Sequence, residues 1–80
     1  MTKDQIRAHV LAALETVAPE AGEIDGAANL RDALDLDSID FLNFVVALHK
    51  SVGVEVPEGD YRRMGSLDAC VEYLATRLPA

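Results

Sequence analysis

The sequence lacks most features of a secreted, membrane-bound or nucleic-acid-binding protein. Its 80 residues include one cysteine, Cys70, which excludes an internal disulfide and favours a reducing compartment. No apolar run approaches the roughly 18 residues of a membrane span, and the first residues lack the basic start and apolar core of a signal peptide. Lys and Arg total 7 against 14 Asp and Glu, which leaves too little positive charge to bind a phosphate backbone. We therefore expect a cytoplasmic protein with no membrane span and no nucleic-acid partner.

Motifs for catalysis and metal binding are equally scarce. There is no Gly-x-Ser-x-Gly sequence, so no serine-hydrolase nucleophile is indicated. A stretch beginning at Asp35 has the alternating acids of a calcium loop. However, Ile39, Asp40 and Val46 stand where that loop needs its third ligand, its turn glycine and its closing glutamate. We expect neither a metal site nor an enzyme activity.

Half of the residues are hydrophobic, which indicates a folded chain, and the length suffices for one domain spanning residues 1–80. A first helix is predicted from the capping pair Thr2 and Gln5 until Pro19 ends it. A last helix is predicted after the cap Ser66. Its apolar residues, at spacings of four, three and four, are Leu67, Val71, Leu74 and Leu78.

A second helix is predicted from Ser38 to Val52. Asp37 is its expected N-cap, with Asp40 as capping-box partner, and Gly53 is its expected C-cap. We expect it to be the central helix, because it is the most apolar. The residues predicted for its inner face are Leu42, Val45, Val46 and Leu48, with Phe41, Phe44 and Val52 contributing.

Between the first two helices, residues 19–36 are expected to form a long loop. A short helical turn at Leu30 and Leu34 should pin this loop to the core. A short third helix is predicted from Glu58 to Arg63, before Gly65 ends it. The prediction is an all-α fold, a small four-helix bundle with three principal helices and one short helix.

The acidic charge is concentrated in one stretch, from Glu15 to Asp40. This acidic stretch holds a single base, Arg31, and eight acids: Glu15, Glu20, Glu23, Asp25, Asp32, Asp35, Asp37 and Asp40. The stretch therefore carries a net charge of −7, which equals that of the whole chain. Two interpretations stay open: recognition of a partner with a basic surface, or a solvated loop that keeps the protein soluble.

Ser38 occupies the predicted first position of the second helix. There its hydroxyl lies beside free backbone N–H groups and the positive end of the helix dipole. A phosphate ester would be electrostatically favoured at this position. The simpler interpretation is a serine that only contributes to a helix cap, worth about 1 kcal/mol.

The triplet Asp37-Ser38-Ile39 follows a leucine-rich acidic approach and opens a helix. This arrangement, with the order and length of elements from Ile6 to Leu78, resembles the acyl carrier protein family. The resemblance implies that a phosphopantetheinyl transferase attaches 4'-phosphopantetheine from coenzyme A to Ser38. The arm's thiol would hold acyl groups as thioesters for fatty acid, polyketide or related specialised biosynthesis. We expect a monomer that delivers them to acyl-loading and acyl-processing enzymes with basic surfaces.

The resemblance also suggests roles for the neighbours of Ser38. The residues expected to take part in partner recognition are Asp35, Asp37, Ile39 and Asp40. The helical spacing of three further residues suggests that they line a space for an acyl chain: Leu42, Val46 and Leu48.

Several positions depart from the family pattern. Asp35 stands where a glycine is common, although aspartate can still adopt a turn conformation. Other residues bring neutral or basic side chains where acids are usual: Asn43, His49, Lys50, Arg62 and Arg63. These departures favour a dedicated carrier of a specialised pathway. Two alternatives stay open: an aminoacyl or peptidyl carrier for nonribosomal peptide chemistry, and an acidic protein-interaction module without a prosthetic group.

Overall fold

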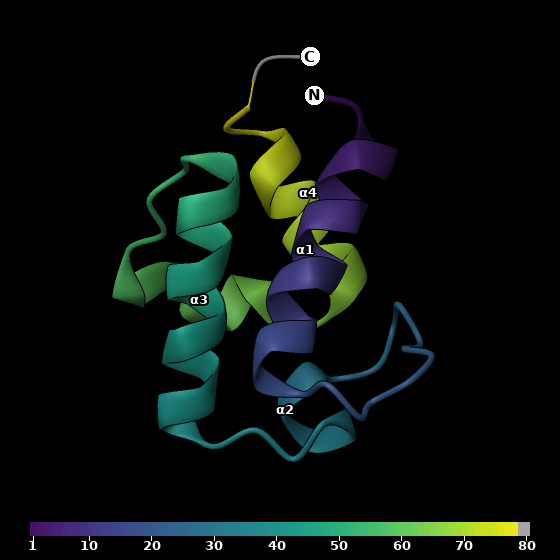
Figure 1. Ribbon diagram of the computed structural model, residues 1–80. Helices are drawn as coiled ribbons and strands as arrows, with labels where there is room; N and C mark the ends of the chain where they lie inside the picture. Colours follow the sequence, from purple (N-terminus) through teal and green to yellow (C-terminus); the bar gives the residue numbers. More distant parts are fainter. Residues whose placement is uncertain (79–80) are drawn as a thin grey trace.

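Five helical segments make up the computed structural model, which describes residues 1–78 (Figure 1). They are α1 (Lys3–Val17), α2 (Leu30–Ala33), α3 (Ser38–Val52), the 3-10 helix η1 (Glu58–Met64) and α4 (Leu67–Ala75). Residues 1–78 contain no strand, so the all-α prediction is confirmed. The predicted short third helix is η1, and α2 is the predicted helical turn. Among the described residues, no helix has both the length and the apolar character needed to cross a membrane.

The helices begin at the residues whose side chains cap them. Thr2 and Gln5 form the predicted capping box of α1, and Asp37 and Asp40 form that of α3. Gly53 ends α3 in the left-handed conformation, with φ of +75°. These ends follow from local sequence, because each cap satisfies backbone groups that the helix itself leaves unpaired.

α1 is the central helix, which corrects the prediction that α3 takes this place. α1 packs against both α3 and α4, while η1 packs against α4. Figure 1 shows α1 running antiparallel to α3 and α4. α4 ends at Ala75, earlier than its apolar pattern predicted, and Leu78 packs against the core from outside the helix. The buried side chains of all five segments form one hydrophobic cluster.

The inward face of α3 differs in part from the predicted one. Its buried residues are Phe41, Phe44, Val45 and Leu48, which follow the i, i+3, i+4, i+7 pattern of one helix face. Leu42 and Val46 lie outside this face and are 47% and 43% exposed, so placing them inside was wrong. The whole helix is rich in apolar residues, and only packing against α1 decides which of them face inward.

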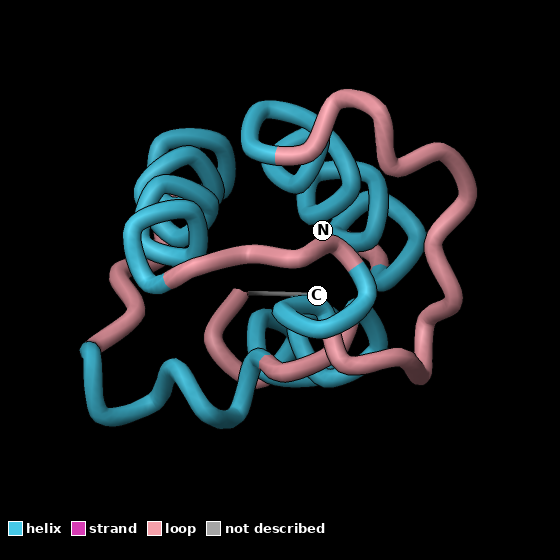
Figure 2. The backbone as a smooth tube through the Cα atoms, turned by 90° about the horizontal axis from the view of Figure 1, so that it is seen from below, coloured by secondary structure: helices cyan, strands magenta, loops and turns pink. Residues whose placement is uncertain are grey.

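The long loop between α1 and α2 lies on the side of α1 away from α3 (Figures 1 and 2). Two backbone hydrogen bonds tie this region to the start of α4: Leu30 N–H donates to Gly65 O at 2.7 Å, and Asp68 N–H donates to Gly26 O at 3.0 Å. Leu30 has no exposed surface. The predicted pinning of the loop by a short helical turn is therefore confirmed, and it fixes the approach to α3.

Candidate functional site

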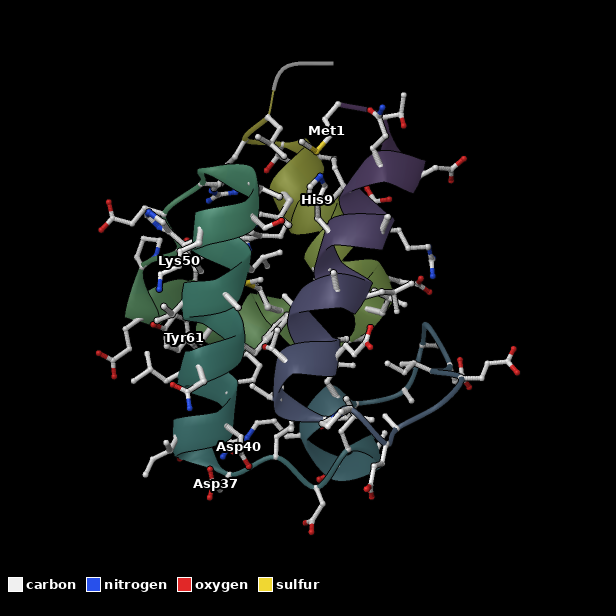
Figure 3. All side chains as sticks on the ribbon, in the orientation of Figure 1. Met1, His9, Asp37, Asp40, Lys50 and Tyr61 are labelled. Atoms are coloured by element: carbon white, nitrogen blue, oxygen red, sulfur yellow. The ribbon has the colours of Figure 1, made fainter. Side chains whose placement is uncertain are left out.

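Ser38 is the first residue of α3 and is exposed. The capping box around it is reciprocal. Asp40 N–H donates to Asp37 Oδ1 at 2.8 Å, and Asp37 N–H donates to Asp40 Oδ2 at 3.4 Å. Figure 3 shows both aspartates at the end of α3 that adjoins α2. Because the aspartates supply the cap, the Ser38 hydroxyl is held on a fixed turn without being used by it.

Asp35 makes the turn that leads into α3. It has φ of +52°, the left-handed region that non-glycine residues seldom enter, and aspartate tolerates it better than most. The expected turn conformation at this position is therefore confirmed. The turn also lets Leu36 N–H donate to Arg31 O at 2.9 Å, with Leu36 buried.

Arg31 is a site residue that sequence reasoning missed. Its Nη2 donates to Ser38 Oγ at 3.4 Å across the turn between α2 and α3. The available signal was its isolation as the one base among residues 15–40. Periodicity alone could not place it, because the contact depends on how the Asp35 turn folds α2 back toward Ser38.

A pocket of about 730 Å³ lies beside Ser38, bordered by α2, α3 and η1. Its lining includes Arg31, Ser38, Ile39, Leu42, Tyr61 and Arg62. Of the three residues predicted to line an acyl space, Leu42 borders this pocket. Val46 borders a smaller one of about 200 Å³ with His49 and Lys50, and Leu48 is fully buried in the core.

The four residues predicted for partner recognition gather at this end of α3. Asp35 and Asp37 are exposed, Asp40 is half-buried, and Ile39 is 69% exposed. Lys50 lies toward the other end of the helix (Figure 3). α3 therefore presents acids at its start and a base near its end, the order that its dipole favours.

The buried thiol belongs to the core and not to this site. Cys70 Sγ–H donates to Met64 O at 3.4 Å, and burial raises the pKa of the thiol from 9.0 to about 12. A thiol held in its protonated form is a poor nucleophile. Across residues 1–78, no three His, Cys, Asp or Glu side chains converge in a metal-binding cluster.

The family model and the relatives that match this chain point to the same family. The family model described as "Phosphopantetheine attachment site" matches residues 4–74. The chain is 33% identical over 60 residues to an acyl carrier protein of Renibacterium salmoninarum, covering 75% of this chain and 72% of that protein. It is 26% identical over 77 residues to the mitochondrial acyl carrier protein 2 of Arabidopsis thaliana, covering 95% of this chain and 61% of that protein. An acyl carrier protein of Lactobacillus johnsonii is 37% identical over 46 residues, which is 58% of each chain. The chain thus spans about three fifths of the length of two of these relatives.

The family match implies a covalently attached 4'-phosphopantetheine prosthetic group. The residues around Ser38 fit such a group. An exposed hydroxyl at a helix N-terminus, with a guanidinium at 3.4 Å, suits a singly charged phosphodiester. The pocket beside it is wide enough to receive part of a flexible arm. On the family match and these relatives, the chain belongs to the acyl carrier protein family.

Proposed function

We propose that Ser38 carries the 4'-phosphopantetheine arm and that the chain works as an acyl carrier, not as an enzyme. The observation that carries this proposal is the exposed Ser38 hydroxyl on the first turn of α3, held by the Asp37–Asp40 capping box. Ser38 Oγ would form the ester bond to phosphorus and lose its proton, while the nucleotide half of coenzyme A leaves. A phosphopantetheinyl transferase would catalyse this step. The bound arm supplies a thiol that holds acyl groups as thioesters.

The chain's own residues have distinct parts in this function. Free N–H groups at the start of α3 favour the negative charge of the ester. Asp37 fixes the turn as the N-cap of α3. Its side chain is also exposed, so a partner enzyme can contact it. Leu42, with its side chain at the pocket beside Ser38, is the predicted acyl-lining residue best placed to contact cargo.

The exposed face of α3 supports docking of partner enzymes. Ile39, Leu42 and Val46 follow one another at spacings of three and four, so they form one apolar stripe. Asp35 and Asp40 lie at the Ser38 end of this stripe. An apolar centre with an acidic rim suits enzymes with basic surfaces, here the transferase and the acyl-loading and acyl-processing enzymes.

We further infer a dedicated carrier for fatty acid, polyketide or related specialised biosynthesis. His49 and Lys50 are exposed in the last turn of α3, and Arg62 and Arg63 are exposed on η1. A partner that spans the whole length of α3 would therefore need acids opposite Lys50 as well as bases opposite Asp40. This mixed pattern favours dedicated partner enzymes.

Loading with coenzyme A and a promiscuous phosphopantetheinyl transferase tests the proposal. The wild type should gain the mass of one phosphopantetheine, and Ser38→Ala should gain none. Ser51→Ala is the matched control, because Ser51 is also an exposed serine of α3 and should leave loading intact. A wild type that gains no mass would favour the interaction module without a prosthetic group.

A further inference from the structure

We propose that Arg31 is a positioning residue, which pairs with the phosphodiester formed on Ser38 and turns the arm toward the pocket between α2, α3 and η1. This inference rests on the attachment at Ser38 proposed above. It assigns a role in holding the arm to the single base among the acidic residues 15–40.

The contact itself is the first support. Arg31 Nη2 lies 3.4 Å from Ser38 Oγ, the atom that would be esterified. A phosphodiester formed at this oxygen would place two charged, non-bridging oxygens two bonds beyond it, next to the same guanidinium. The planar fork of arginine matches two oxygens of a phosphate group, whereas a lysine would act only as a point charge.

The second support is that no carboxylate of residues 1–78 forms a salt bridge with Arg31. The salt bridges found within residues 1–78 join Lys3 to Glu72, Arg7 to Asp68 and Arg77 to Asp60. Arg31 is in none of them, although acids surround it in the sequence. Its guanidinium is therefore available to an anion on Ser38.

The third support is the anchoring of the backbone that carries Arg31. Its neighbour Leu30 is fully buried, and Leu30 N–H donates to Gly65 O at 2.7 Å. On the other side, Leu36 N–H donates to Arg31 O at 2.9 Å. A side chain that must hold a phosphate in one direction works best from such a fixed backbone.

The position of the pocket indicates the direction in which the arm would lie. Arg31 and Ser38 both line it, and Leu42 and Tyr61 line it farther along. The part of the arm next to the phosphate combines a dimethyl carbon with a hydroxyl and an amide. This mixture suits a lining that combines the apolar side chain of Leu42 with the ring and hydroxyl of Tyr61. Arg62 adds a second exposed cation to the same lining.

The expected effect is moderate, because Arg31 is exposed. An exposed arginine–anion pair would bias the docked over the free arm by up to roughly fivefold. A bias of this size keeps the arm against the carrier between encounters and still lets a partner enzyme draw it away.

Nuclear magnetic resonance of the loaded protein tests the inference. Wild type, Arg31→Gln and Arg31→Lys are loaded with arm labelled with carbon-13 and nitrogen-15, and intact mass confirms loading. Arg63→Gln is the matched control. It removes the same charge as Arg31→Gln, but Arg63 contacts the Tyr73 ring and not Ser38, with its Cζ 5.2 Å from the ring centroid. The readouts are the phosphorus-31 shift of the phosphodiester, the heteronuclear Overhauser effect of the arm amide nearest the phosphate, and the Arg31 Nε–Hε signal.

Wild type and Arg63→Gln should share one phosphorus shift and a restricted amide, whereas Arg31→Gln should shift the phosphorus signal and free the amide. Arg31→Lys should recover part of the effect. In the wild type, loading should move the Arg31 Nε–Hε signal, which decides the matter even if the transferase rejects Arg31→Gln. Identical phosphorus and amide data for both glutamine variants, or an Arg31 signal unchanged by loading, would overturn the role of Arg31 and leave attachment intact. A wild type that cannot be loaded would overturn both.

Discussion

At Asp35 the backbone adopts a conformation that a side chain makes costly. The position has φ of +52°, in the left-handed region, and it sets the turn that brings Arg31 to Ser38. The left-handed conformation costs most non-glycine residues roughly 1–2 kcal/mol, and aspartate less than most. Aspartate at position 35 therefore carries some backbone strain, which a glycine would avoid, and adds a negative charge just before α3.

We predict that Asp35→Ala lowers the free energy of unfolding by roughly 1 kcal/mol relative to Asp35→Gly, because alanine has neither the freedom of glycine nor the polar side chain of aspartate. Urea unfolding followed by circular dichroism measures the difference. Asp35→Asn controls for the lost charge and should stay close to the wild type. Equal stability of the alanine and glycine variants would show that this turn is not strained.

At the scale of elements, α4 holds η1 in place and thereby one wall of the Ser38 pocket. Tyr73 O–H donates to Asp60 Oδ2 at 2.6 Å, and the Arg77 guanidinium lies 3.8 Å from the centroid of the Tyr73 ring. Cys70 donates to Met64 O at the same junction. Tyr61 and Arg62 of η1 line the pocket. The shape of the pocket therefore depends on the contacts that join η1 to α4.

Cys70 gives this junction a measurable pH dependence. Burial raises the pKa of its thiol from 9.0 to about 12, so the folded state keeps the proton that the unfolded state loses. This contribution to the free energy of unfolding is fully present below pH 9 and is lost as the pH rises from about 9 to about 12. Burial and the bond to Asp60 also raise the pKa of Tyr73, in the same direction.

Stability measured by urea unfolding should therefore fall less steeply above pH 9 in Cys70→Ala than in the wild type. The difference between the two proteins isolates the thiol from Tyr73, which both retain. Parallel pH profiles would contradict a raised pKa of Cys70. A buried, protonated thiol also leaves the thiol of the arm as the reactive one in the loaded protein.

For the whole molecule, the net negative charge lies in residues 15–40, the stretch that leads into the end of α3 that carries Ser38. We predict that Asp40→Asn lowers kcat/KM for transferase loading by roughly two- to fivefold, because asparagine keeps an oxygen for the capping box but removes a charge that attracts a basic enzyme. Added salt should slow the wild type and shrink its advantage, since the Debye length falls to about 3 Å at 1 M.

Asp4→Asn is the matched control for Asp40→Asn. Asp4 is exposed in the first turn of α1, whose start lies at the opposite end of the molecule from the start of α3 (Figure 1). It should leave loading nearly unchanged. Loading rates that respond neither to Asp40→Asn nor to salt would return the acidic stretch to a role in solubility.

The parts of this molecule that local sequence decides were predictable, and those that packing decides were not. The bounds of α3 follow from its caps, Asp37 and Gly53, because capping involves only neighbouring residues. The exposure of Leu42 was not predictable, since choosing the inward face of an apolar helix requires its neighbours. The contact of Arg31 with Ser38 requires the Asp35 turn, whose direction no periodicity encodes.

The central claim is that Ser38 carries the arm, and intact-mass analysis of the protein purified from its own cell tests it most directly. We predict a population heavier by one phosphopantetheine, with or without an acyl group, and peptide mapping should place the added mass on Ser38. The acyl mass would also identify the cargo. A protein found wholly unmodified, or modified at another residue, would contradict the account.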